Sequence, residues 1–253
     1  MLTIRSAVLS AAILTAATAA TALGGPLTPP PGPPSSTGRT LTEIEPRTPL
    51  TLSVAPGDAD SLYRISQPGN YYLTGDLVGV AGKKGIEVTA DDVTIDLNGF
   101  TMRGAAGAKQ AIGDHDDENL PHPKNLRVRN GSVVAWPQGG LVSDWIDSVR
   151  LEGLAFEANG FAGVAMSGEL LATDCAFRDH TQYGLLNDGS GLVSGCVASE
   201  NGFVGFSVRG MVMVDSQASR NATGFSGDET LFENCSATAN TYAGFELGGA
   251  AIG

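Results

Sequence analysis

The sequence predicts an all-β protein: a single-stranded right-handed parallel β-helix (a solenoid) with coils of about 19–22 residues. Three observations predict this fold. The C-terminal half repeats with that period, columns of similar residues stay aligned between repeats, and short apolar segments alternate with Gly, Asn and Asp. Such units are too short for a helix pair and lack a 3.6-residue apolar period. Coils stacked about 4.8 Å apart would place like residues over like, which explains the columns.

Five repeat units define the columns: residues 151–164, 172–185, 193–206, 213–225 and 232–245. One column is the apolar residue that follows a Gly in each unit, and we expect it to point into one continuous core. Its members are Val164, Leu185, Phe206, Phe225 and Phe245. A second column contains residue types that tolerate a left-handed turn. Its members are Gly153, Asp174, Gly195, Asp215 and Asn234.

Two further columns predict the polar interior. The first predicts buried small side chains rather than catalytic or paired cysteines, and contains Leu154, Cys175, Cys196, Ser216 and Cys235. Cys175 and Cys196 lie one coil apart, but parallel Cβ directions are unfavourable for a disulfide. The other column predicts an internal ladder of side-chain amides, and contains Asn159, His180, Asn201, Asn221 and Asn240. Because His180 occupies an Asn position, we interpret it as structural rather than as a general base.

Residues 1–22 predict a signal peptide. Arg5 is the only charge, an Ala/Thr/Leu run follows it, and Ala-Thr-Ala at residues 20–22 fits a small-x-small cleavage site. A membrane span is the alternative, but the run is rich in Ala and Thr and ends at a Gly-Gly-Pro sequence. We therefore expect an exported protein, extracellular or periplasmic, with no membrane span once the signal is removed.

Residues 23–56 predict a Pro-rich linker, because nine of the thirteen prolines lie between Pro26 and Pro56. The β-helix domain is then expected to cover residues 57–253.

We expect the two ends of this domain to close differently. Residues 57–77 contain Tyr63, Tyr71 and Tyr72 and predict an N-terminal cap. The C-terminal coil has no comparable cap, so we expect self-association through this open coil, or pairing with a partner. The alternative is that residues 246–253 fold back and plug that end.

One coil carries an insertion. Strand-then-turn segments occur at residues 93–100 and 126–133, and the step from Gly99 to Gly131 is 32 residues, against 22 from Gly131 to Gly153. The insertion therefore adds roughly ten residues to one repeat. It lies at residues 113–123.

The insertion contains four carboxylates and two of the three histidines, and loops on a rigid scaffold often form binding sites. The candidate catalytic residues are His115, Asp116, Asp117 and His122. The candidate Ca²⁺ ligands are Asp114, Asp116, Asp117 and Glu118, and we expect no other cofactor. The EF-hand spacing is not present. A solvated acidic loop is the alternative, and the one we favour, because only side chains that meet in space make a site.

Three segments carry a resemblance to a known family. Residues 65–73 (ISQPGNYYL), 85–88 (GIEV) and 95–100 (IDLNGF) resemble the opening of secreted bacterial right-handed parallel β-helix proteins of the pectate-lyase-like superfamily. The resemblance covers about residues 57–253 and implies the scaffold. It implies no single activity, since the superfamily includes lyases, hydrolases, epimerases and members without known activity.

The catalytic motifs of that superfamily are not found. The polygalacturonase-like set of Asn-Thr-Asp, Asp-Asp, Gly-His-Gly and Arg-Ile-Lys is absent. Trp145-Ile146-Asp147 superficially resembles the Trp-Ile-Asp-His segment of pectate lyases, but Ser148 replaces the His.

Composition and motifs leave two function classes. An excess of acidic over basic residues, 27 to 15, disfavours a nucleic-acid partner. The first class is an exported non-catalytic module that binds a glycan, another cell-envelope component or a protein. The second is a polysaccharide lyase or hydrolase that acts on acidic, uronate-containing polysaccharide. The missing motifs and an aromatic content of 6%, which predicts few rings for stacking on sugars, favour the first.

Overall fold

The computed structural model describes residues 45–115, 121–248 and 251–252, and these residues contain strands and turns only. No helix in this part of the chain could span a membrane. The predicted signal peptide, residues 23–44 of the predicted linker, and Asp116, Asp117 and Glu118 lie outside the described residues.

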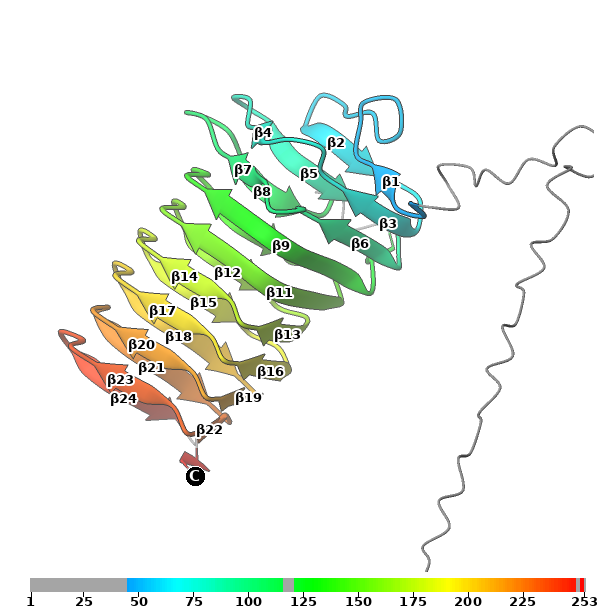
Figure 1. The fold of residues 1–253 in the computed structure, drawn as a ribbon. Helices are drawn as coiled ribbons and strands as arrows, with labels where there is room; N and C mark the ends of the chain where they lie inside the picture. The colour runs from blue at the N-terminus through cyan, green and yellow to red at the C-terminus, as the bar shows by residue number, and fades with distance from the viewer. Residues whose placement is uncertain (1–44, 116–120, 249–250, 253) are drawn as a thin grey trace, which may run out of the picture. The chain divides into compact units, whose positions relative to one another are not determined.

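Two parallel sheets wind side by side into a β-solenoid of about nine turns, each turn stacking on the one before it (Figure 1). The predicted all-β parallel β-helix is therefore confirmed. We call the sixteen-stranded sheet sheet A and the nine-stranded sheet sheet B. Sheet B contributes one strand per turn: β2 (Ser61–Ile65), β5 (Lys84–Val88), β8 (Gln110–Gly113), β10 (Gly139–Ser143), β12 (Ala162–Met166), β15 (Tyr183–Asn187), β18 (Val204–Arg209), β21 (Thr223–Asp228) and β24 (Ala243–Gly248).

Sheet A has two rows of strands, joined through two long strands. Its first row is β1 (Thr48–Pro49), β3 (Gly69–Tyr72), β6 (Val93–Asp96), β9 (Leu126–Val134), β11 (Ser148–Glu157), β13 (Glu169–Thr173), β16 (Gly191–Ser194), β19 (Met211–Val214), β22 (Leu231–Glu233) and β25 (Ala251–Ile252). Its second row adds β4 (Leu77–Val78), β7 (Thr101–Arg103), β14 (Ala176–Arg178), β17 (Val197–Ser199), β20 (Gln217–Ser219) and β23 (Ser236–Thr238). The strands β9 and β11 are long enough to belong to both rows.

The predicted core column forms in the predicted register. Val164, Leu185, Phe206, Phe225 and Phe245 are consecutive partners across sheet B. The first four are fully buried and Phe245, in the last coil of sheet B, is partly buried. Phe206 and Phe225 stack with ring centroids 5.3 Å apart, and Phe225 and Phe245 stack at 4.8 Å. The core is thus a continuous apolar stack along the solenoid.

The predicted left-handed turn column is also confirmed. Positive φ angles of 51–62° occur at Gly153, Asp174, Gly195, Asp215 and Asn234. A second left-handed column, which the sequence analysis did not identify, contains Ala158, Asp179, Glu200, Arg220 and Ala239. Each of these residues directly precedes a member of the predicted amide ladder. The residue with positive φ and the ladder side chain therefore belong to the same turn.

The ladder of Asn and His side chains runs through five coils. The Oδ1 atom of Asn201 accepts a hydrogen bond from the His180 N–H, and Oδ1 of Asn221 accepts one from the Asn201 N–H, at 3.1 and 3.0 Å. Asn240 and Asn159 make the same contact to the coil before them. Each Asn also donates through Nδ2 to a carbonyl of the previous coil. The ladder therefore satisfies buried backbone groups that would otherwise be unpaired.

The cysteines lie where the column predicts. Cys175 and Cys196 are buried, Cys235 is half-buried, and all three are free thiols. The Cys175 N–H donates to Sγ of Cys196 at 3.4 Å, and the Cys196 N–H donates to the Ser216 hydroxyl at 3.3 Å. The column thus packs the interior and accepts backbone hydrogen bonds.

The N-terminal boundary differs from the prediction. Residues 57–77, expected as a cap, form β2, β3 and the start of β4 in the first turn. Residues of the predicted linker cover this end instead: β1 pairs with β3, and Leu50 and Ala55 are buried. The prolines suggested a linker, but an edge strand tolerates Pro49 and the neighbouring apolar side chains bury surface there.

At the C-terminal end, the alternative of a folded-back plug is not what the structure shows. β24 continues sheet B to Gly248, and β25 then pairs in parallel with β22 of sheet A. The last described residues therefore begin another coil.

Candidate functional site

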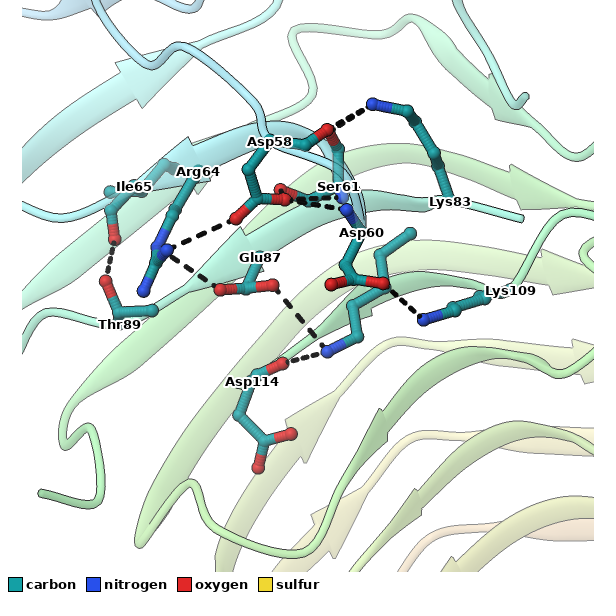
Figure 2. A network of polar contacts seen from close by, with 11 residues as sticks. Asp58, Asp60, Ser61, Arg64, Ile65, Lys83, Glu87, Thr89, Lys109 and Asp114 are labelled. Carbon is teal, nitrogen blue, oxygen red and sulfur yellow. Dashed lines mark hydrogen bonds and ion pairs between the residues drawn. The ribbon is translucent and has the colours of Figure 1, made fainter. Parts of the chain in front are cut away.

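At the N-terminal coils, a network of charged side chains covers the outer face of sheet B (Figure 2). Lys84 is only 1% exposed, and its Nζ lies 2.6 Å from the Asp114 carbonyl oxygen and 3.7 Å from Glu87 Oε2. Arg64 reaches Glu87 at 3.3 Å and Asp58 at 3.2 Å. A buried Lys and a buried Glu require such partners, because desolvation of an isolated charge costs several kcal/mol.

Asp114, a predicted Ca²⁺ ligand, anchors the start of the insertion. Its Oδ2 accepts hydrogen bonds from the Ser143 hydroxyl at 2.8 Å and from the Trp145 N–H at 2.7 Å. Burial raises the pKa of this carboxyl above its ordinary value, against the smaller opposing effect of these two donors. Asp114 thus fastens the insertion to the segment that precedes β11.

The two predicted histidines lie at separate places. His115 is buried, and its Nε2 lies 3.2 Å from the Pro121 carbonyl oxygen. The His122 ring lies against Trp145 with centroids 5.0 Å apart, and its Nδ1 is 3.4 Å from Asp147 Oδ1. Trp145 and Asp147 of the Trp-Ile-Asp segment therefore contact His122. Among the described residues, no group of three His, Cys, Asp or Glu side chains is arranged to hold a metal ion.

Calcium is expected to have little effect on stability. The Asp114 carboxylate already accepts two protein donors. We expect millimolar Ca²⁺ to leave the melting temperature of the wild type and of Asp116→Asn unchanged, as measured by circular dichroism. A Ca²⁺-dependent rise that Asp116→Asn abolishes would contradict this prediction and establish the site.

The described part of the chain brings a different set of charges together on the outer face of sheet A, across β6, β9 and β11. We call this surface the arginine face, and it consists of Thr94, Asp96, Arg127, Arg129, Arg150 and Glu152. Along β9 and β11 the burial alternates, so that Leu126, Val128 and Val149 point inward while the arginines point outward. The parallel register then pairs Thr94 with Arg127, and Arg127 with Arg150.

Asp96 is the fixed anion of the arginine face. It is 4% exposed, and its Oδ2 lies 3.0 Å from both Arg47 Nη1 and Arg129 Nη2. Burial alone would raise its pKa, but hydrogen bonds from the Asn98 N–H and the Asn130 amide, together with the two guanidinium groups, hold the pKa below its ordinary value. Asp96 is therefore ionised and orients arginines.

Of the three arginines that point outward, Arg150 makes the longest ion pair with a carboxylate of the protein. Arg127 Nη2 lies 2.5 Å from Glu152 Oε2, whereas Arg150 Nη1 is 4.0 Å from Glu152 Oε1. Half of the Arg150 side chain is exposed. Glu152 is therefore bound closely by Arg127, and the more exposed Arg150 guanidinium is available to bind a further anion.

A groove of about 450 Å³ lies beside these arginines. Its lining combines hydroxyl, amide and charged groups with apolar side chains: Asp92, Thr94, Asn125, Leu126, Arg127, Ser148, Val149, Arg150, Glu169 and Leu171. The Asn125 side-chain amide donates a hydrogen bond to Asp92 Oδ1 at 2.8 Å. The Ser148 hydroxyl donates to Asn125 Oδ1 at 3.3 Å. Side chains of this kind can hydrogen-bond the hydroxyls of a sugar while an arginine binds an acidic group.

The sequence analysis missed this site. Its signal was present as the alternating segment Leu126-Arg127-Val128-Arg129, in which two arginines share one face of a strand. The partners Asp96 and Glu152 come from other coils, and only the register places them beside the arginines.

Comparison with known proteins supports the fold. The sequence matches no protein-family model, and no curated protein matches it. Among solved structures, the Dettilon tailspike protein (gp208) is similar, with 11% identity and a TM-score of 0.51 over 77% of this chain and 53% of the tailspike chain. This chain thus spans about half the length of that protein.

Two other solved structures share less of the geometry. The enzymatically active domain of bacteriophage CBA120 tailspike protein 2 has 12% identity and a TM-score of 0.49, over 81% of this chain and 37% of that one. The A-module of Azotobacter vinelandii mannuronan C-5 epimerase AlgE4 has 12% identity and a TM-score of 0.26, over 82% and 86%. At this identity the likeness to the Dettilon tailspike protein concerns the fold alone.

Proposed function

We propose that this protein is an exported, non-catalytic β-helix module that binds an acidic polysaccharide on the arginine face. The observation that carries the proposal is the pair Arg127 and Arg150, which lie directly opposite each other beside a groove lined by hydroxyl and amide groups. Because Glu152 engages Arg127 closely and Arg150 only at 4.0 Å, a uronate carboxylate placed there would accept hydrogen bonds from the exposed Arg150 guanidinium.

The arrangement of the carboxylates favours binding over catalysis. Hydrolysis of a glycosidic bond uses one carboxylic acid that is protonated and one carboxylate. On the arginine face, Asp96 is ion-paired with Arg47 and Arg129, and its pKa lies below its ordinary value. Asp96 therefore positions guanidinium groups and is poorly suited to donate a proton.

The chain as a whole carries a formal net charge of −12, which opposes an acidic ligand at long range. At physiological ionic strength, charges more than about 8 Å apart are largely screened. Local pairing with Arg127 and Arg150 then determines affinity, and we expect binding to weaken as salt is raised.

The test is a titration of the protein with uronate hexasaccharides, both galacturonate and mannuronate, followed by calorimetry. Arg150→Gln should weaken binding about tenfold or more, because it removes a charge-assisted hydrogen bond while keeping a polar side chain of similar length. Arg209→Gln, on the outer face of sheet B, is the matched control and should bind as the wild type does.

The same samples, with and without Ca²⁺, are examined for new reducing ends and for unsaturated products. We expect neither. Product formation would overturn the non-catalytic part of the proposal and favour a lyase or hydrolase. Equal affinity of the wild type and Arg150→Gln, or no binding of either uronate, would overturn the arginine face as the binding site.

A further inference from the structure

We propose a second glycan-binding surface on the outer face of sheet B, for an uncharged polysaccharide strand that runs along the solenoid axis. A groove of about 860 Å³ follows this face from β10 to β24. It begins where the charged network of Figure 2 ends, on the same face of the same sheet. It is separate from the arginine face, which belongs to sheet A.

The floor of the groove is one outward-facing column of sheet B. Ala165, Leu186, Ser207 and Ser226 are consecutive partners in the parallel register, and all four line the groove. Most of these side chains are small, so the floor lies below the larger side chains on both edges. The hydroxyls of Ser207 and Ser226 face a ligand as hydrogen-bond donors and acceptors.

A row of aromatic rings adjoins the groove at Phe161, the aromatic residue among its lining side chains. Phe161 lines the groove, and its ring meets Tyr183 edge to face at 5.6 Å, while Tyr183 meets Phe203 at 5.5 Å. Phe203 is 50% exposed and Tyr242 is 80% exposed, which is unusual for rings of this size. A low aromatic content therefore did not mean few exposed rings, because the fold gathers them in one row.

The spacing of these rings fits an extended sugar chain. Phe161, Phe203 and Tyr242 directly precede β12, β18 and β24, so an aromatic residue stands at this position in every second coil. Two coils correspond to about 10 Å along the axis. This distance is comparable to the two-residue repeat of a β-1,4-linked chain, in which every second pyranose presents the same face to a ring.

The charged lining residues set the charge of the ligand. The groove is lined by four carboxylates, Asp144, Asp188, Asp228 and Glu246, and by a single arginine. That arginine, Arg209, bridges Asp188 at 2.9 Å and Asp228 at 3.4 Å. The excess of negative charge repels a uronate chain, whereas the carboxylates accept hydrogen bonds from sugar hydroxyls.

The test is a titration of the full chain with four uncharged hexasaccharides: β-1,4-linked glucose, mannose, xylose and N-acetylglucosamine. We expect at least one to bind, with an affinity that does not change between low and high salt. Phe161→Ala should weaken this binding about tenfold, as removal of an aromatic contact does at other binding surfaces. Ser207→Trp should abolish it, because the indole fills the floor of the groove.

Two controls separate this site from the arginine face. Ser194→Trp places the same side chain on an outward position of sheet A and should leave uncharged-glycan binding intact. Arg150→Gln should also leave it intact, while Phe161→Ala should leave uronate binding intact. Failure of all four hexasaccharides to bind would overturn the proposal. Binding that persists in both Phe161→Ala and Ser207→Trp, in variants whose melting curves match the wild type, would overturn it as well.

Discussion

Replacing Phe206 with Asp should unfold several coils of the solenoid. Phe206 is fully buried, stacks on Phe225 at 5.3 Å and meets Phe177 edge to face at 6.0 Å. The substitution removes these contacts and buries a carboxylate among aromatic rings. We expect a loss of at least about 4 kcal/mol in the free energy of unfolding. Because each coil is stabilised by its neighbours, the loss should extend to β15, β21 and β24.

The matched control is Ser207→Asp. It introduces the same carboxylate one residue later, on the outward column, and should change the free energy of unfolding by no more than about 0.5 kcal/mol. Urea titration measures the size of the effect, and hydrogen exchange measures which strands lose protection. A melting curve for Phe206→Asp that matches the wild type would contradict the core register.

Acidification should destabilise the protein through His180. Its Nδ1 accepts a hydrogen bond from the Asn159 N–H at 3.0 Å, so the neutral ring carries its proton on Nε2. Nε2 lies near the Phe156 carbonyl oxygen but outside hydrogen-bond geometry. Burial lowers the pKa of His180 to about 4 from an ordinary value of 6.5, against the smaller opposing effect of the Asn159 and Phe156 backbones.

The direction of the effect follows from proton binding. Between pH 6.5 and about 4, the unfolded chain binds a proton at His180 and the folded chain does not. The free energy of unfolding therefore falls as the pH is lowered through this interval, and the contribution of His180 is fully present above pH 6.5. A shift of this size corresponds to about 3 kcal/mol across the interval.

His180→Asn isolates this contribution, because Asn is the residue that the ladder uses in the neighbouring coils. The variant should fold, and its Nδ2 should donate to the Phe156 carbonyl as Asn201 does to Phe177. The measurement is the free energy of unfolding in urea at a series of pH values. We expect the variant to lose about 3 kcal/mol less than the wild type between pH 6.5 and 4. Identical pH profiles would show that other groups cause the acid sensitivity.

The columns could be predicted from the sequence because the parallel β-helix repeats the same environment in every coil. Val164, Leu185 and Phe206 occupy equivalent positions, so a period in the sequence corresponds directly to a period in space. The Asn ladder was predictable for the same reason. The acidic insertion was less predictable. Asp114 is held by Ser143 and Trp145, and His122 meets Asp147, contacts that no local pattern encodes.

The second left-handed column shows where sequence patterns stop being informative. Ala158, Glu200 and Arg220 adopt φ angles of 52°, 61° and 57°, although these residue types rarely do. The amide of the next residue bonds to the neighbouring coil and holds each turn in this conformation. The cost of about 1–2 kcal/mol per residue is offset by hydrogen bonds that exist only once the coils have stacked.

By itself, the sequence determined the fold class, the coil length, the core column, one turn column and the position of the insertion, because each depends on residues repeated at a regular spacing. Only the tertiary structure decided the two candidate surfaces. Arg127 and Arg150 come from different coils, as do Phe161 and Tyr183, and the parallel register places the members of each pair side by side. The physical reason is that the core is specified coil by coil through burial, whereas a surface site arises from lateral neighbours that are distant along the chain.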